Sequence, residues 1–337
     1  MPKKHTTLKD LANELGIHFT TVSRALRNHP NVSPETRKRV LELAEERGYQ
    51  PDSIAQNLKS KKSYTIAVMV PEIQNDFFSS VISGIEEVAY QEGYTIMVFQ
   101  SNEDYQREQL NLRPIVSQRV AGLLISVSKS TLNGNHFKKL EKQHIPIVFF
   151  DRFCKDVKAS RVYTDDYIGA MKAVEHLISQ GYQRIAHLAG PESVSVSKSR
   201  FEGYVHALKK HNVHIEESLI IYGGFQEEDG RQGLRKLLDN NLRPDAVFTV
   251  NDFVASGVYL QAKESGILIP RDLAVVGFGN NNISKLMSPP LTTVRQSTRE
   301  MGIRAAKLLL REINTKEDEF MPITEVIIPE LEVREST

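Results

Sequence analysis

Residues 19–24, Phe-Thr-Thr-Val-Ser-Arg, bring hydroxyl groups, an aromatic ring and a guanidinium together on a short stretch with helical spacing. Val22 and Leu26 give this helix its inward face, because residues four apart lie on the same side. The outward-facing residues are then Phe19, Thr20, Thr21, Ser23, Arg24 and Arg27. Short polar side chains followed by arginine suit the donors and acceptors that base edges present in the major groove. The stretch therefore predicts a helix that reads double-stranded DNA.

Two further helices must hold that helix in place. Thr7 and Asp10 have the spacing of a capping box, in which each side chain bonds a backbone N–H at the start of a helix. Gly16 follows Ala12 by four residues, as expected where two helices cross steeply and the turn needs a positive φ. A third helix is predicted over residues 33–48. The pattern favours a helix-turn-helix domain, and a helical bundle with no role in DNA binding is the alternative.

Basic residues gather at the amino-terminal end of the chain. Residues 1–62 hold twelve Lys and Arg against seven Asp and Glu, a net charge of +5, whereas the whole chain carries +1. The remaining residues therefore carry −4. A small basic domain attached to an acidic body is typical of nucleic-acid binding concentrated in one place.

The chain has 337 residues, with no tryptophan and one cysteine, Cys154. A lone cysteine excludes an intramolecular disulfide and a thiolate-clustered zinc site. The amino terminus, MPKKHTTLKD, is polar, and no stretch approaches the roughly 18 apolar residues that a membrane span needs. We expect a cytoplasmic protein of two or three domains that does not enter a membrane.

Beyond Lys62 the sequence alternates between short β-branched runs and amphipathic stretches of helical length, a pattern typical of α/β domains with parallel sheets. The first series of predicted strands is 65–70, 94–99, 122–127 and 146–151. The pattern then restarts, and the second series is 161–165, 184–190, 218–224, 246–252 and 274–279. The repetition predicts two similar lobes, each built on a parallel sheet.

A helix at 297–314 and a strand at 323–329 remain after the second series. They indicate that the chain crosses between the lobes more than once, which would make the connection a hinge. The predicted organisation is a helix-turn-helix domain at 1–50, a hinge at 51–62, an amino-terminal lobe at 63–161 with 293–322, and a carboxy-terminal lobe at 162–292 with 323–337.

Two long segments and the body resemble a known family over essentially the whole chain. The segments are 7–26, TLKDLANELGIHFTTVSRAL, and 31–63, NVSPETRKRVLELAEERGYQPDSIAQNLKSKKS, and the family is LacI/GalR, the lactose-repressor and galactose-repressor family. The resemblance implies a sequence-specific transcriptional regulator, in most cases a repressor, controlled by a small molecule. It assigns base reading to Phe19, Thr20 and Arg24, and contacts with the DNA backbone to Thr7, Thr21 and Ser23.

The same resemblance implies that residues 51–59 form a hinge that becomes helical on operator binding. Leu58 is an apolar residue in a polar tract, and its two copies, one per subunit, would wedge into the central base step from the minor groove. Ala55 and Lys59 would lie beside it.

The family's body resembles periplasmic sugar-binding proteins, which hold ligand between two lobes. Such a cleft lies outside the carboxyl ends of the strands, so its residues should follow strands directly. The predicted effector-binding residues are Asp76, Phe77, Phe78, Asp151, Arg152, Arg200, Phe225, Asn251 and Asp252. Polar groups beside aromatic rings suit a sugar or a base, although one of the paired phenylalanines at 77 and 78 should face the core.

Two positions refine that expectation. Arg200 is a natural bidentate donor to a ligand. Gly279 stands where relatives often carry aspartate, so a carboxylate that often grips two ligand hydroxyls is missing. An effector that is larger, acidic or held differently is therefore expected.

Other classes of function fit less well. The chain has no P-loop, GxSxG or HExxH motif, so we expect no enzyme, no cofactor and no metal site. A periplasmic binding protein would leave residues 1–62 unexplained, whereas a regulator controlled by a docked partner protein remains an alternative. The chain ends at PELEVREST with no leucine-heptad helix, which favours a homodimer on a pseudo-palindromic operator.

Overall fold

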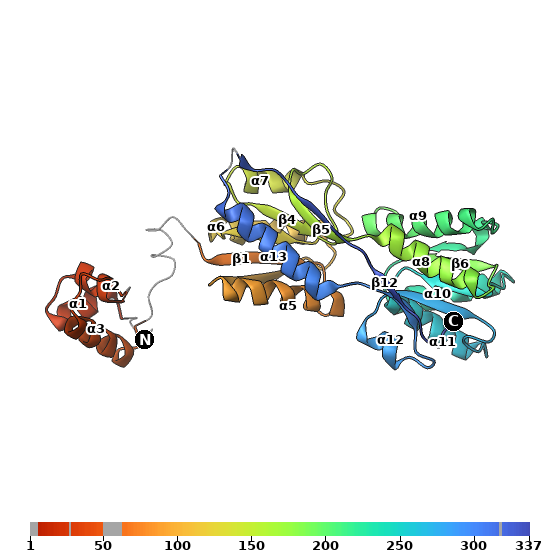
Figure 1. Ribbon diagram of the computed structural model, residues 1–337, viewed down its shortest axis with the longest axis horizontal. Coiled ribbons are helices and arrows are strands. Elements are labelled where there is room, and N and C mark those ends of the chain that lie inside the picture. Colours follow the sequence, from red (N-terminus) through yellow and green to blue (C-terminus); the bar gives the residue numbers. More distant parts are fainter. Residues whose placement is uncertain (1–5, 27, 50–62, 317–318) are drawn as a thin grey trace. The chain divides into compact units, whose positions relative to one another are not determined.

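The computed structural model of the protein describes residues 6–26, 28–49, 63–316 and 319–337, and the chain divides into two units at Ser63 (Figure 1). The predicted hinge, with Ala55, Leu58 and Lys59, lies outside the described residues, and so does Arg27.

The first unit contains three helices, α1 (Leu8–Leu15), α2 (Phe19–Leu26) and α3 (Pro34–Glu46). The predicted capping box is present, because the Asp10 N–H donates to the Thr7 hydroxyl while the Asp10 carboxylate accepts from the Thr7 N–H. Gly16 ends α1 with a φ of 65°, which glycine adopts without steric cost. Apolar side chains of all three helices form one core, and the predicted helix-turn-helix architecture is confirmed.

The amino-terminal lobe contains a six-stranded parallel sheet in the order β11-β5-β4-β3-β1-β2. Its strands are β1 (Thr65–Val70), β2 (Thr95–Gln100), β3 (Gly122–Ile125), β4 (Ile147–Phe150), β5 (Ser160–Thr164) and β11 (Thr324–Ile327). One face packs against α5 (Asp76–Gln91) and α13 (Thr298–Asn314). The other packs against α6 (Tyr105–Ser117), the 3₁₀ helix Asn135–Phe137 and α7 (Lys138–Glu141).

The carboxy-terminal lobe contains a second six-stranded sheet in the order β12-β10-β9-β8-β6-β7. Its strands are β6 (Ile185–Ala189), β7 (Ile220–Tyr222), β8 (Ala246–Thr249), β9 (Ala274–Gly279), β10 (Thr292–Arg295) and β12 (Glu330–Glu332), of which only β12 is antiparallel to its neighbour. The helices are α8 (Asp166–Ser179) and α9 (Ser195–Lys210) on one face, α10 (Glu227–Asp239) and α11 (Asp252–Glu264) on the other, then α12 (Asn282–Leu286) and the 3₁₀ helix Glu217–Leu219.

Three segments pass between the lobes, and their strand pairing corrects the predicted boundaries. β5 pairs with β4 in the first sheet, so the first crossing follows Thr164 rather than Arg161. β10 pairs with β9, so residues 293–295 belong to the carboxy-terminal lobe. β11 pairs with β5 whereas β12 pairs with β10, so the prediction that placed 323–329 in the carboxy-terminal lobe is wrong. Apolar patterning marks a strand but does not tell which sheet edge receives it.

Within residues 6–26, 28–49, 63–316 and 319–337, no helix is long and apolar enough to cross a membrane.

Candidate functional sites

The outer surface of α2 carries the residues predicted to read bases. Phe19 is 44% exposed and Arg24 is also exposed, while Val22 and Ala25 are buried against the other two helices. The other predicted residues of this helix are half-buried: Thr20, Thr21 and Ser23. The helix therefore presents an aromatic ring and a guanidinium to solvent above a row of hydroxyls.

The hydroxyl of Thr7, which the sequence predicts to contact the DNA backbone, already makes two hydrogen bonds within the protein. The hydroxyl donates to the Asp10 carboxylate at 2.7 Å and accepts from the Asp10 N–H at 3.3 Å. A contact from the Thr7 hydroxyl to DNA would replace the first of these two bonds. Thr7 is thus the N-cap of α1 as well as a candidate DNA contact.

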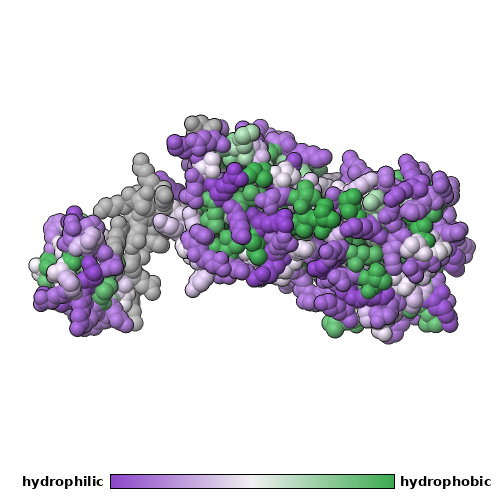
Figure 2. All heavy atoms as spheres, viewed as in Figure 1, coloured by the Kyte–Doolittle hydropathy of each residue, from purple (hydrophilic) through white to green (hydrophobic). Residues whose placement is uncertain are grey.

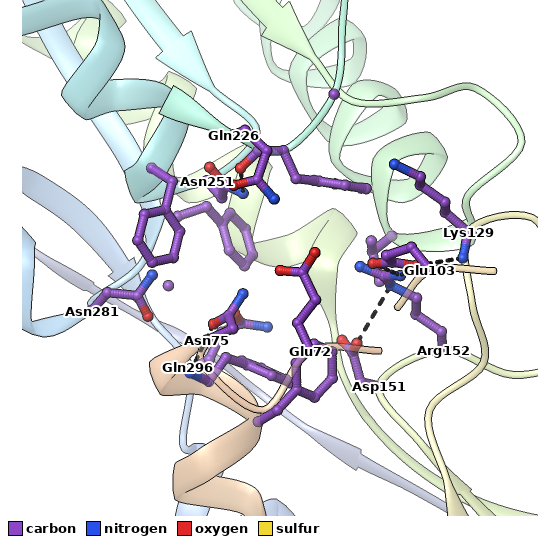
Figure 3. Close-up of a pocket in the computed structure, with 18 of the residues that line it drawn as sticks. Glu72, Asn75, Glu103, Lys129, Asp151, Arg152, Gln226, Asn251, Asn281 and Gln296 are labelled. Atoms are coloured by element: carbon purple, nitrogen blue, oxygen red, sulfur yellow. Dashed lines mark hydrogen bonds and ion pairs between the residues drawn. The ribbon is translucent and has the colours of Figure 1, made fainter. Parts of the chain in front are cut away.

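A cavity of about 370 Å³ lies between the two lobes of the body (Figure 3). Its walls are built from segments that follow strands of both sheets, as a cleft at the carboxyl ends of parallel strands requires. The amino-terminal lobe contributes Glu72, Gln74, Asn75, Phe77, Phe78, Glu103, Lys129, Asp151 and Arg152. The segments of the carboxy-terminal lobe and of the second crossing contribute Val196, Arg200, Gly224, Phe225, Gln226, Asp229, Asn251, Phe253, Phe278, Gly279, Asn281 and Gln296.

The structure brings most of the predicted effector residues to this cavity. The residues present are Phe77, Phe78, Asp151, Arg152, Arg200, Phe225 and Asn251. Phe78 is almost fully buried in the core of its lobe while Phe77 is only partly buried, so one ring of the pair does face inward. Asn75, which precedes them, caps α5 through the Phe77 N–H at 2.9 Å and also lines the cavity.

Two predicted effector residues do not line the cavity. Asp76 begins α5 and is absent from the walls. Asp252 is fully buried, where it accepts from the Thr293 hydroxyl at 2.6 Å and from the Asn281 N–H at 2.7 Å. Burial raises the pKa of Asp252 to about 6. Because Asp252 follows a strand, the sequence placed it correctly at the ligand-binding edge of the sheet. Its carboxylate, however, turns away from the cavity and bonds the backbone N–H of Asn281, which does line the cavity.

Arg152 is the centre of the charged wall (Figure 3). Its guanidinium is 2.8 Å from a Glu103 carboxylate oxygen and 3.7 Å from that of Asp151, and it lies 5.1 Å from the centre of the Phe225 ring in the other lobe. The Ser126 hydroxyl donates to Asp151 at 3.2 Å, and burial raises the pKa of the Asp151 carboxyl. The amino-terminal lobe thus reaches across the cavity with a cation on an aromatic face.

Arg200 is held inside the carboxy-terminal lobe. It pairs with Asp166 at 2.6 Å, donates to the Val250 carbonyl at 2.6 Å and stacks 3.7 Å from the centre of the Phe278 ring. Burial raises the pKa of Asp166, the first residue of α8, to about 6, although the Arg200 charge opposes that rise. The sequence predicted that the Arg200 guanidinium would donate hydrogen bonds to a ligand. Most of its N–H groups instead bond within the lobe and stabilise the start of α8, just after the first crossing.

Comparison with known proteins identifies the family. Residues 7–52 match "Bacterial regulatory proteins, lacI family", and residues 174–337 match "Periplasmic binding protein-like domain". The chain is 36% identical over 306 residues to "HTH-type transcriptional repressor CytR" of Escherichia coli (strain K12), covering 90% of this chain and 89% of the relative. The chain belongs to the lacI family. A second relative, "Catabolite control protein A" of Priestia megaterium, is 32% identical and covers 92% of this chain and 93% of its own.

Solved structures of transcriptional regulators match both units. A lac repressor dimer bound to operator and the anti-inducer ONPF has a TM-score of 0.88 at 27% identity, covering 99% of each chain. A CelR–cellobiose complex has a TM-score of 0.73 at 28% identity, covering 99% of this chain and all of the other. The predicted combination of a helix-turn-helix domain with a two-lobed periplasmic-binding-protein-like body is therefore confirmed.

Several cavity residues of this lacI-family chain were not predicted. Gln296 directly follows β10, a strand that the sequence did not predict, and its position at a strand end could have identified it once that strand was recognised. Glu103 and Lys129 lie three and four residues beyond β2 and β3, and Gln226 and Phe253 lie four residues beyond β7 and β8, where spacing alone does not indicate a cavity. Within the described ranges, no three His, Cys, Asp or Glu side chains are grouped to hold a metal ion.

Proposed function

We propose that this lacI-family protein is a transcriptional repressor whose affinity for a pseudo-palindromic operator is controlled by a neutral, hydroxyl-rich molecule of the sugar class. The observation that carries the proposal is the cavity between the lobes, which combines aromatic faces with many hydrogen-bonding groups. Aromatic faces pack on the apolar face of a sugar ring or a base, while amides and carboxylates bond its hydroxyls.

The charges of the cavity favour a neutral ligand over an anion. Four carboxylates and three cations line it, and the buried Asp166 and Asp252 lie directly behind the wall. Two of the cations are already paired, Arg152 with Glu103 and Arg200 with Asp166. A phosphate or carboxylate ligand at Arg152 or Arg200 would have to displace one of these partners, and the free carboxylate would then remain in a dry site. Lys129 is the third cation, and an anion held by Lys129 would face the four carboxylates of the lining. The acidic effector considered from the sequence is therefore disfavoured.

Structural relatives support the sugar class. Solved structures similar to this chain include a regulator complexed with cellobiose, a lacI-family regulator with bound ribose and a regulator complexed with D-xylulofuranose. The last two are 29% and 28% identical to this chain with TM-scores of 0.71 and 0.70. Their ligands span pentoses and a disaccharide, so the relatives support a class and leave the individual sugar open.

Ligand control follows from the way the lobes are joined. A molecule that contacts both walls binds best at one separation of the lobes and shifts the population toward it. The amino-terminal lobe begins directly after residue 63, so its position in a dimer affects the spacing at which two DNA-reading heads meet their half-sites. Control by a docked partner protein is the alternative, and the cavity favours the small molecule.

A homodimer is part of the proposal. β2 is an edge strand of the first sheet, and Tyr90, Val98 and Leu110 expose apolar surface on α5, β2 and α6. Hydrophobic patches also interrupt the mostly hydrophilic face of the body shown in Figure 2. An unpaired edge beside exposed apolar side chains suits contact with a second copy. Binding to bacterial operators would place the dimer in the cytoplasm, as the sequence predicts.

The proposal is tested with the purified full-length chain. Operator sequences are first selected from genomic DNA, and thermal melts are then run with neutral sugars, nucleosides and sugar phosphates. We expect a neutral hydroxylated compound to raise the melting temperature and to change operator affinity in a fluorescence-anisotropy titration. Stabilisation by sugar phosphates alone would contradict the ligand class, and operator control that requires an added protein would favour the partner-controlled alternative.

A further inference from the structure

A second cavity, of about 300 Å³, lies wholly within the carboxy-terminal lobe. It is bounded by the loop after β6, the first two turns of α9 and the end of the edge strand β7. Its lining residues are Gly190, Glu192, Ser197, Lys198, Phe201 and Tyr222, none of which lines the cavity between the lobes.

The wall of this second cavity contains an unsatisfied polar group. Ser197 is only 2% exposed, and its hydroxyl has no hydrogen-bond partner among the residues that the structure describes. Buried hydroxyls are nearly always bonded, so this one indicates a missing partner. A Cβ on Gly190 would stand 2.4 Å from the Ser197 oxygen, so the oxygen packs directly against the glycine and a larger residue at 190 would displace it. The N-cap of α9, Val194, supplies no side-chain bond to the first turn either.

Two aromatic rings and two opposite charges complete the lining. The Phe201 and Tyr222 rings are 6.0 Å apart with their planes at 51°, and Tyr222 is 48% exposed. Burial raises the pKa of Tyr222, and the nearby Glu192 carboxylate adds to that rise. Lys198 lies 4.0 Å from Glu202 with both side chains largely exposed, so its ammonium is only loosely held. One carboxylate and one ammonium leave the lining without net charge.

We propose that this cavity is a second ligand site, which takes one neutral sugar ring. Angled aromatic rings offer an apolar face for such a ring, while Glu192 and Lys198 supply an acceptor and a donor for its hydroxyls. One ligand hydroxyl satisfies the buried Ser197 oxygen. The volume is at the low end for small-molecule pockets, which fits a monosaccharide and excludes a long chain.

The second site is separate from the first but touches its wall. A Cβ on Gly190 would lie 2.4 Å from the Ser197 hydroxyl oxygen and 2.9 Å from the Phe225 ring, and Phe225 lines the cavity between the lobes. A sugar ring that binds beside Ser197 would therefore shift the packing around Gly190, and the position of the Phe225 ring depends on the same packing. Through the contact of Phe225 with Arg152, occupancy of one site is expected to change affinity at the other.

The test uses the full-length chain labelled with 3-fluorotyrosine and followed by ¹⁹F NMR. The chain has eleven tyrosines, and a Tyr222→Phe variant identifies the resonance of Tyr222. D-Glucose, D-galactose and D-ribose are the titrated probes. We expect the Tyr222 resonance to shift and saturate with at least one of them, and the same titration to persist in Lys129→Met, which changes an exposed residue that lines only the first cavity.

Matched serine variants test the chemistry of the second site. Ser197→Ala removes the hydroxyl partner and is expected to weaken the Tyr222 titration by about fivefold. Ser83→Ala, which removes an exposed helical serine in the other lobe, is expected to leave it unchanged. A Tyr222 resonance that responds to none of the three sugars overturns the proposal, as does a response that Lys129→Met abolishes or that Ser197→Ala leaves intact. The proposed repressor function, on which this inference rests, is tested separately by measuring operator affinity. A failed Tyr222 titration would therefore contradict only the second site, and unchanged operator affinity would contradict only the repressor function.

Discussion

Arginines in the DNA-reading unit and in the body have opposite surroundings. Arg24 is exposed on α2, where its guanidinium faces solvent. Arg152 and Arg200 are only 7% and 5% exposed, and the side chains of their carboxylate partners Glu103 and Asp166 are 11% and 7% exposed. An arginine of the first unit can therefore bind a partner such as DNA, whereas these two arginines of the body are part of its packed interior.

This difference predicts whether a substitution will change binding alone or will also change the stability of the fold. Removing an exposed cation changes what the molecule binds, whereas removing a buried one leaves an uncompensated charge behind. Substitutions in the two units should accordingly differ in what they change, and the following experiments test that contrast in order of decreasing effect.

Arg200→Met should have the largest effect, a loss of about 3–5 kcal/mol in the free energy of unfolding near pH 7.5. Asp166 would be left buried without its cation. Because the folded pKa of Asp166, about 6, lies above its ordinary value of 3.8, this group favours folding at low pH and loses that contribution as the pH rises through 6. Removing Arg200 raises that pKa further, so the deficit should shrink as the pH is lowered to 5.

Urea unfolding at the two pH values measures this effect. Arg235→Met is the control, because Arg235 is half exposed and lies 3.7 Å from Glu264. That variant should cost no more than about 1 kcal/mol at either pH. An Arg200→Met deficit of the same size at pH 7.5 and pH 5 would show that Asp166 is not the source.

Arg24→Ala should weaken operator binding by roughly 1–3 kcal/mol and relax base preference, with no change in unfolding free energy. Lys59→Ala should instead weaken binding to all sequences alike and reduce the salt dependence, as expected for a phosphate contact. Anisotropy titrations on operator and random DNA compare the two variants. Equal losses on both DNAs for Arg24→Ala would remove it from the base-reading set.

Leu58→Ala should lower specific operator affinity by about 1.5 kcal/mol, the scale of one buried leucine side chain. Melting temperature and ligand affinity should stay at wild-type values, because the wedge gains its burial only in bent DNA. A circular-permutation gel should show less bending of the operator. Normal bending with normal affinity would make residues 51–62 an ordinary tether.

Thr7→Ala tests whether one residue serves both folding and DNA binding. Loss of the N-cap should destabilise the first unit by about 1 kcal/mol, and loss of the hydroxyl should weaken DNA binding at the same time. Thr7→Ser keeps the hydroxyl and should restore both properties. If Thr7→Ala bound all DNA normally while the first unit was destabilised, Thr7 would be a cap without a role at the phosphate.

Local patterns in the sequence determined the elements of this protein. The runs at 65–70 and 274–279 match β1 and β9 residue for residue, because β-branched runs bounded by turn residues leave few other conformations. The capping box and Gly16 likewise fixed the start and the end of α1. These features depend on neighbours along the chain, which a sequence displays directly.

The edge of the sheets at which ligands gather was also determined by the sequence. Phe77, Asp151, Arg152 and Asn251 could be placed there because each follows a strand, and parallel strands end at one edge. What could not be predicted was the direction of each side chain. Asp252 has the same relation to its strand as Asn251, yet it turns into the lobe toward Thr293.

Only the tertiary structure decided the partners of charged groups and the lobe to which late segments belong. β11 joins the first sheet because its backbone pairs with β5, more than 150 residues earlier, and nothing in its own sequence selects that edge. Arg200 is committed to Asp166 and the Val250 carbonyl for the same reason, since those contacts come from helices and loops far apart in the chain. Local sequence sets conformation through short-range sterics and hydrogen bonding, whereas burial and charge pairing depend on which distant surfaces meet.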